Sequence, residues 1–143
     1  MGQGAFSIFD ISGSGMTAER MRMNVIAHNI ANAQTTRTKE GGPYKRQYVV
    51  FEEALAGARR DLDGLIGDVG AGVRVAETGA DQRKVPPVYL PGHPDADENH
   101  MVQMPNVSPI MEMLDMMNAS RGYQANVMAI SNAKQMILKA LEI

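Results

Sequence analysis

The sequence predicts an α+β fold, in which long N- and C-terminal helices pack as a coiled coil beside a small, loop-heavy, β-rich middle domain. Three observations predict it: apolar residues recur at helical spacing towards both ends, glycine and proline concentrate between them, and short strand-like runs lie in that middle segment. Nine of the 14 glycines lie between Gly41 and Gly92. We therefore predict a terminal helical domain of residues 1–35 and 107–143 and an outer domain of residues 36–106.

The first helix is predicted from about Phe6 to Gln34, because apolar residues recur there every seven positions. The first third of this segment has a low helix propensity, since Gly13 and Gly15 each cost about 1 kcal/mol relative to alanine. We expect fraying or a bend there. The apolar row consists of Phe9, Met16, Met23 and Ile30.

The middle segment contains short runs with strand composition, separated by glycine-rich and proline-rich stretches. A short helix from Ala54 to Leu65 is an alternative for one part of it. The predicted strands run from Gln47 to Glu52, Gly72 to Thr78, Val88 to Leu90 and Met101 to Met104.

The second helix is predicted to begin after Ser108, which can cap it, with Pro109 in the first turn, where a missing N–H is tolerated. Steps of three and four residues then define a coiled-coil heptad, interrupted by two polar residues. A helix with so broad an apolar stripe needs more than one neighbour. The heptad positions are Met113, Met116, Ser120, Tyr123, Val127, Ile130, Lys134, Ile137 and Leu141.

Composition excludes several classes of function. The chain has 14 lysines and arginines against 16 aspartates and glutamates, a net charge of −2, so nucleic-acid binding is disfavoured. Without cysteine it has no disulfide or thiolate metal site. No apolar run approaches the roughly 18 residues of a membrane span, and the first residues lack the basic and apolar regions of a cleaved signal. We expect an unprocessed chain with no membrane insertion.

The densest polar cluster runs from His93 to His100 and allows two interpretations. Its imidazoles and carboxylates could bind a divalent metal, although an EF-hand loop from Asp95 would need glycine at His100 and glutamate at Asn106. A solvated acidic turn is the favoured interpretation. No nucleophile, phosphate-binding or catalytic motif is present, so we expect neither an enzyme nor a cofactor.

Amide side chains are unusually frequent on the two predicted helices. Asparagine is a mediocre helix former, so such a cluster indicates either cross-helix hydrogen bonds that fix register or a tolerated polar face. Spacing alone does not separate the two. The amides are Asn24, Asn29, Asn32, Gln124 and Asn126.

Five short motifs occur along the chain, at Arg22 to Val25, Asn29 to Thr35, Tyr89 to Ala96, Met104 to Val107 and Ser120 to Asn126. These motifs resemble the bacterial flagellar axial family of rod and hook proteins, and within it the subunits of the proximal rod. The resemblance runs in order from Phe6 to Ile143. Gly15 stands where such proteins usually carry alanine.

This resemblance implies a non-enzymatic rod subunit in the periplasm, exported without a cleaved signal peptide by the flagellar type III export apparatus. Its implied partners are other copies of itself in a helical assembly, the other proximal and distal rod proteins and the protein at the junction of MS ring and rod. The rival hypothesis is a free-standing coiled-coil adaptor, and a different rod-family subunit is a second alternative. The residues we expect at the assembly interface are Met16, Met23, Asn29, Ile30, Asn32, Arg121, Tyr123, Gln124, Asn126, Val127, Ile130, Ile137 and Leu141.

Overall fold

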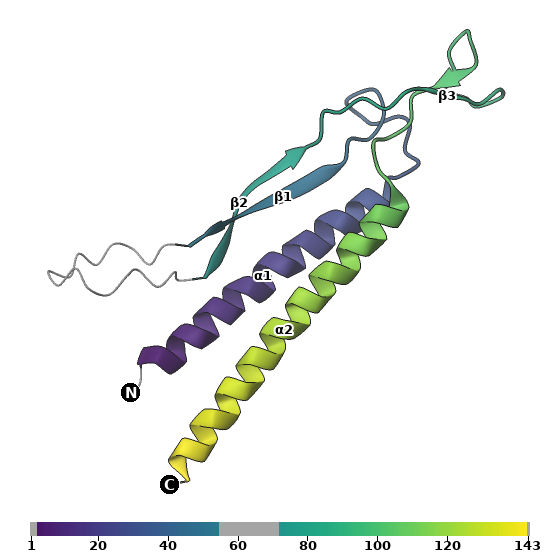
Figure 1. Ribbon diagram of the computed structural model, residues 1–143. Coiled ribbons are helices and arrows are strands. Elements are labelled where there is room, and N and C mark those ends of the chain that lie inside the picture. The colour runs from purple at the N-terminus through teal and green to yellow at the C-terminus, as the bar shows by residue number, and fades with distance from the viewer. Residues whose placement is uncertain (1–2, 55–71, 143) are drawn as a thin grey trace, which may run out of the picture. The chain divides into compact units, whose positions relative to one another are not determined.

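The computed structural model describes residues 3–54 and 72–142 and confirms an α+β architecture of two long helices and two small antiparallel sheets (Figure 1). The coiled-coil packing of the helices stays a prediction. The short helix considered from Ala54 to Leu65 falls almost entirely outside the described residues. In chain order the elements are α1 (Gln3–Ala31), β1 (Gln47–Glu53), β2 (Val73–Ala80), β3 (Val88–Tyr89), β4 (Met101–Val102) and α2 (Pro109–Leu141).

Helix α1 is continuous through the glycine-rich segment where we expected fraying or a bend. One of the two glycines, Gly15, is a place of close approach. A side chain at Gly15 would meet the amide of Asn126 at 2.9 Å, whereas Gly13 has nothing within 4 Å of the corresponding position. Tertiary contact therefore offsets the low helix propensity of this segment.

Helix α2 begins at Pro109, as predicted. The carbonyl of Ser108 accepts the N–H of Glu112 at 3.0 Å, which places Ser108 at the N-cap position. Glu112 in the first turn and Lys139 in the last turn complement the helix dipole.

Strands β1 and β2 form an antiparallel ribbon. The N–H of Ala54 donates to the carbonyl of Gly72 at 2.9 Å at one end, and the N–H of Asp81 donates to the carbonyl of Arg46 at 2.7 Å at the other. Strands β3 and β4 form a second, shorter pair, with Val88 opposite Val102 and Tyr89 opposite Met101. All four predicted strands are present, the last two shorter than predicted.

The chain divides into two compact units, each containing part of both helices. The first comprises, among the described residues, 3–21, 50–54, 72–77 and 118–142. Its buried side chains are small, namely Ser12, Ala18, Ala119 and Ala133.

The second unit comprises residues 22–49 and 78–117. It buries larger side chains, namely Val25, Ile26 and Val102 together with the polar Asn29 and Glu112. The division into a terminal helical domain and an outer domain stays a prediction. None of the described helices combines the length and hydropathy that a membrane span requires.

Candidate assembly site

Helix α2 buries its small side chains and exposes its large ones. Within the first unit α1 and α2 run antiparallel, because Gly15 lies against Asn126 and the carboxylate of Glu19 lies 3.1 Å from the position of a side-chain carbon at Gly122. Ala119 and Ala133 on the same face of α2 are 0% and 2% exposed. A row of small residues is what lets two helix backbones approach closely.

The predicted heptad of α2 is only partly covered within the chain. Tyr123, Ile130 and Ile137 are half-buried, but Val127 is 42% and Leu141 is 78% exposed. The residues of α2 that are buried lie about one position N-terminal to the predicted heptad residues. The reason is that small residues, and not the large apolar ones, contact α1. On α1, Met16, Met23 and Ile30 are half-buried. Their role in assembly stays a prediction.

The opposite face of α2 carries a row of exposed residues spaced three or four apart, here called the outward row. Arg121 and Gln124 lie between Met117 and Met128 in this row, and both are exposed. The full row is Ile110, Leu114, Met117, Arg121, Gln124, Met128, Ser131, Gln135 and Leu138. Its apolar members have no cover within the described part of the chain.

A buried polar network, here called the junction network, joins both helices and β1 inside the second unit. The side chain of Asn29 is completely buried and makes four hydrogen bonds. Its amide nitrogen donates to the carbonyl of Gln47 at 2.8 Å and to Glu112 Oε2 at 3.0 Å. Its amide oxygen accepts the hydroxyl of Tyr44 at 3.0 Å and the N–H of Gln47 at 2.9 Å. The cross-helix interpretation of the amide cluster therefore holds for Asn29.

The buried carboxylate at the centre of the junction network has a cationic partner. Glu112 has a side chain that is 1% exposed, and Arg46 Nε donates to its Oε1 at 2.5 Å. Arg46 Nη2 reaches Asp115 Oδ2 at 3.2 Å. A carboxylate buried without such a partner would be strongly destabilising, so Arg46 is what permits Glu112 in this position.

The junction network changes the pKa of Tyr44. Burial raises the pKa of its hydroxyl above the usual 10.0, and the nearby negative charge of Glu112 raises it further. The neutral hydroxyl therefore persists as the donor to Asn29.

Asn106 fixes the chain just before α2. Its amide oxygen accepts the N–H of Arg46 at 2.7 Å, and its amide nitrogen donates to the carbonyls of Asp81 and Arg83 at 3.0 and 3.2 Å. One side chain thus ties together three segments of the second unit. The sequence analysis assigned no role in this network to Tyr44, Arg46 or Asn106. Of the three, only Asn106 lay in a family motif, which could have indicated its importance.

The other amides do not repeat the role of Asn29. Asn32 donates to the carbonyl of His28 at 2.9 Å, one turn back in α1, and accepts the hydroxyl of Thr35. Asn126 donates to the carbonyl of Gly122 at 2.9 Å within α2. Both bonds are local, and Asn24 and Gln124 are exposed.

The segment from His93 to His100 forms a tight turn. Asp97 Oδ1 accepts the N–H groups of Asn99 and Met101 at 2.9 and 2.8 Å, and Asp95 Oδ2 accepts the hydroxyl of Thr36 at 2.7 Å. His100 adopts a positive φ of 59°. Across residues 3–54 and 72–142, no group of three or more histidine, aspartate or glutamate side chains is placed to hold a metal ion.

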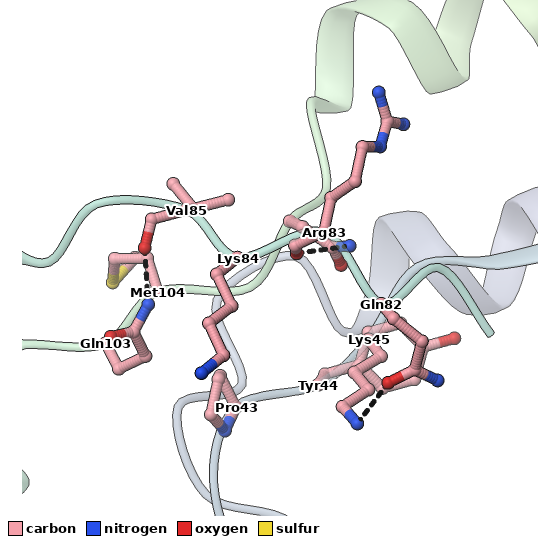
Figure 2. Close-up of a pocket in the computed structure, with 10 residues that line it drawn as sticks. Pro43, Tyr44, Lys45, Gln82, Arg83, Lys84, Val85, Gln103 and Met104 are labelled. Atoms are coloured by element: carbon pink, nitrogen blue, oxygen red, sulfur yellow. Dashed lines mark hydrogen bonds between the residues drawn. The ribbon is translucent and has the colours of Figure 1, made fainter.

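A pocket of 330 Å³ in the second unit is lined by apolar, basic and amide side chains and by no carboxylate (Figure 2). Lys84 extends towards the ring of Pro43, while Lys45 Nζ donates to Gln82 Oε1 at 2.7 Å. The guanidinium of Arg83 points away from both lysines and pairs with Asp81. That pairing holds the pKa of the Asp81 carboxyl below its usual value, chiefly through the hydrogen bond from the Arg83 side chain.

Comparison with known proteins assigns a family to these features. The family described as flagella basal body rod protein matches residues 9–39, and the C-terminal family of the flagellar basal body rod FlgEFG proteins matches residues 98–143. The flagellar basal-body rod protein FlgC of Borreliella burgdorferi is 40% identical, with 98% of this chain and 97% of that protein covered. FlgC of Salmonella typhimurium is 41% identical with 96% of each covered, and FlgC of Bacillus subtilis is 39% identical with 97% of each covered. The chain therefore belongs to the FlgC family of flagellar basal-body rod proteins.

Proposed function

We propose that the chain polymerises through its terminal helices, packed as a coiled coil, into a tubular shaft that transmits torque across the periplasm. Membership in the FlgC family makes it a structural subunit of the flagellar basal-body rod. The observation that supports assembly through the helices is the outward row of α2, whose large apolar side chains are exposed to solvent in the single chain. Ile110, Met128 and Leu138, for example, are 79%, 63% and 51% exposed.

Neighbouring subunits supply the missing cover. Burying apolar surface contributes about 25 cal/mol per Å², so a row of methionine and leucine side chains along a helix of 33 residues supports a specific contact. A head-to-tail contact that does not close produces an open helical assembly, whereas a self-complementary contact stops at a dimer. Methionine adapts its shape to slightly unequal environments, as packing around a tube requires.

The proposal includes the partners that the family implies. These are other copies of the chain, the remaining proximal and distal rod proteins, the protein joining the MS ring to the rod, and the flagellar type III export apparatus. The chain acts by position and contact, without catalysis and without a cofactor. The predicted interface residues Arg121 and Gln124 are exposed in the outward row, and this exposure supports the proposal that they set the register between subunits.

The test replaces an outward side chain without touching the fold of the subunit. Met128→Asp puts a charge where the apolar contact is proposed, while Met128→Leu retains the apolar surface and serves as the matched control. We expect Met128→Asp to abolish incorporation into isolated basal bodies and motility, with an unchanged circular dichroism spectrum, and Met128→Leu to behave as wild type. Ile130→Asp, at a half-buried position, should also abolish incorporation. Normal incorporation of both aspartate variants would refute the proposed role of α2.

A further inference from the structure

We infer that the pocket lined by Lys45 and Lys84, here called the lysine pocket, receives the acidic turn of residues 95–98 from a neighbouring copy of the same chain. The inference rests on the proposed assembly of the chain and names a second contact within it, formed by the middle of the chain and not by the helical faces.

The pocket is already formed in the single chain. Its wall segments are held by the hydrogen bond from Gln103 Nε2 to the carbonyl of Val85 at 2.5 Å and by the two bonds of Asn106 to Asp81 and Arg83. The bond from Lys45 to Gln82 connects the remaining wall (Figure 2). A ligand group entering this pocket therefore encounters a site that does not have to be ordered first.

The local charge is positive and unbalanced. Arg83 is neutralised by Asp81, but Lys84 has no ion pair and Lys45 donates to a neutral amide, within the part of the chain that the structure describes. Pro43, Tyr44 and Met104 provide apolar surface beside the two ammonium groups. The pocket thus suits a carboxylate with aliphatic groups next to it.

The acidic turn has the complementary chemistry. Asp95 is partly engaged by Thr36 and Arg37, and Asp97 caps the turn, so Glu98 is left exposed and without an ion pair among the described residues. The two hydrogen bonds that Asp97 accepts fix the turn, in which Glu98 is exposed. The same unit therefore presents an unpaired cationic pocket and an unpaired anionic turn.

A contact between these two features repeats from copy to copy. Because the pocket and the turn are different surfaces, their contact is heterologous and continues along an assembly instead of closing into a dimer. Charge complementarity of this kind fixes the register of a contact more than it adds affinity. In this proposal the outward row supplies the apolar surface that is buried between copies, and the contact at the pocket fixes their alignment.

Charge reversal tests this contact. Lys84→Glu and Glu98→Lys alone should each reduce incorporation into basal bodies about threefold or more, with a loss that increases at low ionic strength. Lys39→Glu, an exposed lysine outside this pocket, is the matched control and should incorporate as wild type. Circular dichroism of each purified variant should match that of the wild type.

Mixing the two variants decides whether the contact joins copies of this chain. In an alternating assembly the reversed pocket meets the reversed turn, and the unchanged pocket meets the unchanged turn, so cells that express both variants should regain incorporation and motility. No rescue on mixing would overturn the inference, because it would assign one or both sites to a different partner. Normal incorporation of Lys84→Glu alone would also overturn it, and loss of incorporation in Met128→Asp would then leave the proposed function intact.

Discussion

At the scale of single residues, Asn29 connects several segments of the second unit through its hydrogen bonds. It satisfies two donors and two acceptors at once, from Tyr44, Gln47 and Glu112, while it is itself inaccessible to solvent. A buried amide with all of its capacity used specifies one arrangement of the elements around it. Every buried side-chain nitrogen and oxygen atom of the described residues likewise has a partner.

Asn29→Ala should lower the free energy of unfolding by about 2–4 kcal/mol, because it leaves the backbone of Gln47 and the carboxylate of Glu112 with unsatisfied groups. Asn24→Ala is the matched control on the same helix. Asn24 is exposed, so its replacement should change stability by less than about 0.5 kcal/mol. Urea denaturation followed by circular dichroism measures both values, and equal effects would show that Asn29 is not a structural centre.

The role of Asn29 illustrates what residue patterns can predict. The asparagine stood out because it is a poor helix former among apolar positions, and that signal correctly indicated a cross-helix hydrogen bond. Its partners could not be identified in the same way. Glu112 matched a helix dipole and Arg46 preceded a strand, so neither had a local feature that required burial, and their pairing depends on the tertiary fold.

At the scale of elements, periodicity and turn residues located both helices and all four strands. The face of α2 that is buried within the chain was harder to predict. Hydrophobic periodicity locates the apolar residues of a helix, but it does not show which residues contact the other helix of the same chain. Ala119, Gly122 and Ala133 face α1 as small residues, which a search for large apolar side chains passes over. The same cause explains why α1 stays helical through glycines where fraying or a bend was expected.

Two neighbouring glycines of α1 should therefore respond differently to alanine. Gly13→Ala meets open space and should raise the free energy of unfolding by up to about 1 kcal/mol through helix propensity. Gly15→Ala brings a methyl group to 2.9 Å from the terminal amide of Asn126, so displacing that amide should cancel most of the gain in helix propensity and leave the free energy of unfolding little changed. Thermal denaturation of the two variants measures the difference. Equal stabilisation by the two substitutions would show that α1 and α2 are not in close contact at Gly15 and Asn126.

Another close approach links α1 to β2 in the first unit. The N–H of Val73 donates to Ser14 Oγ at 3.0 Å, and Ser14 Oγ donates to the carbonyl of Ile11 at 2.7 Å. Gly72 has a φ of +118°, and a side chain there would overlap Ser14. Glycine is thus required both by the backbone conformation and by the proximity of the helix.

At the scale of the whole molecule, the two units are stabilised to different degrees. The second unit combines a buried hydrogen-bond network, in which Arg46 pairs with Glu112, with Val25, Ile26 and Val102, whereas the first unit buries chiefly alanine and serine. Small side chains remove little apolar surface from water, so the first unit gains less from folding alone. The C-terminal part of α2 also exposes Met136 and Leu141, at 60% and 78%.

Hydrogen exchange of the isolated subunit should therefore show a gradient along each helix. We expect strong protection for amides of residues 22–31 and 112–117, around the junction network, and much weaker protection for residues 8–21 and 118–142, where opening costs less. Assembly should raise protection mainly in the second set, because neighbouring copies then cover the outward row and folding is coupled to binding. Uniform protection of α2 in the free subunit would contradict this coupling and would instead describe helices that are fully ordered before they assemble.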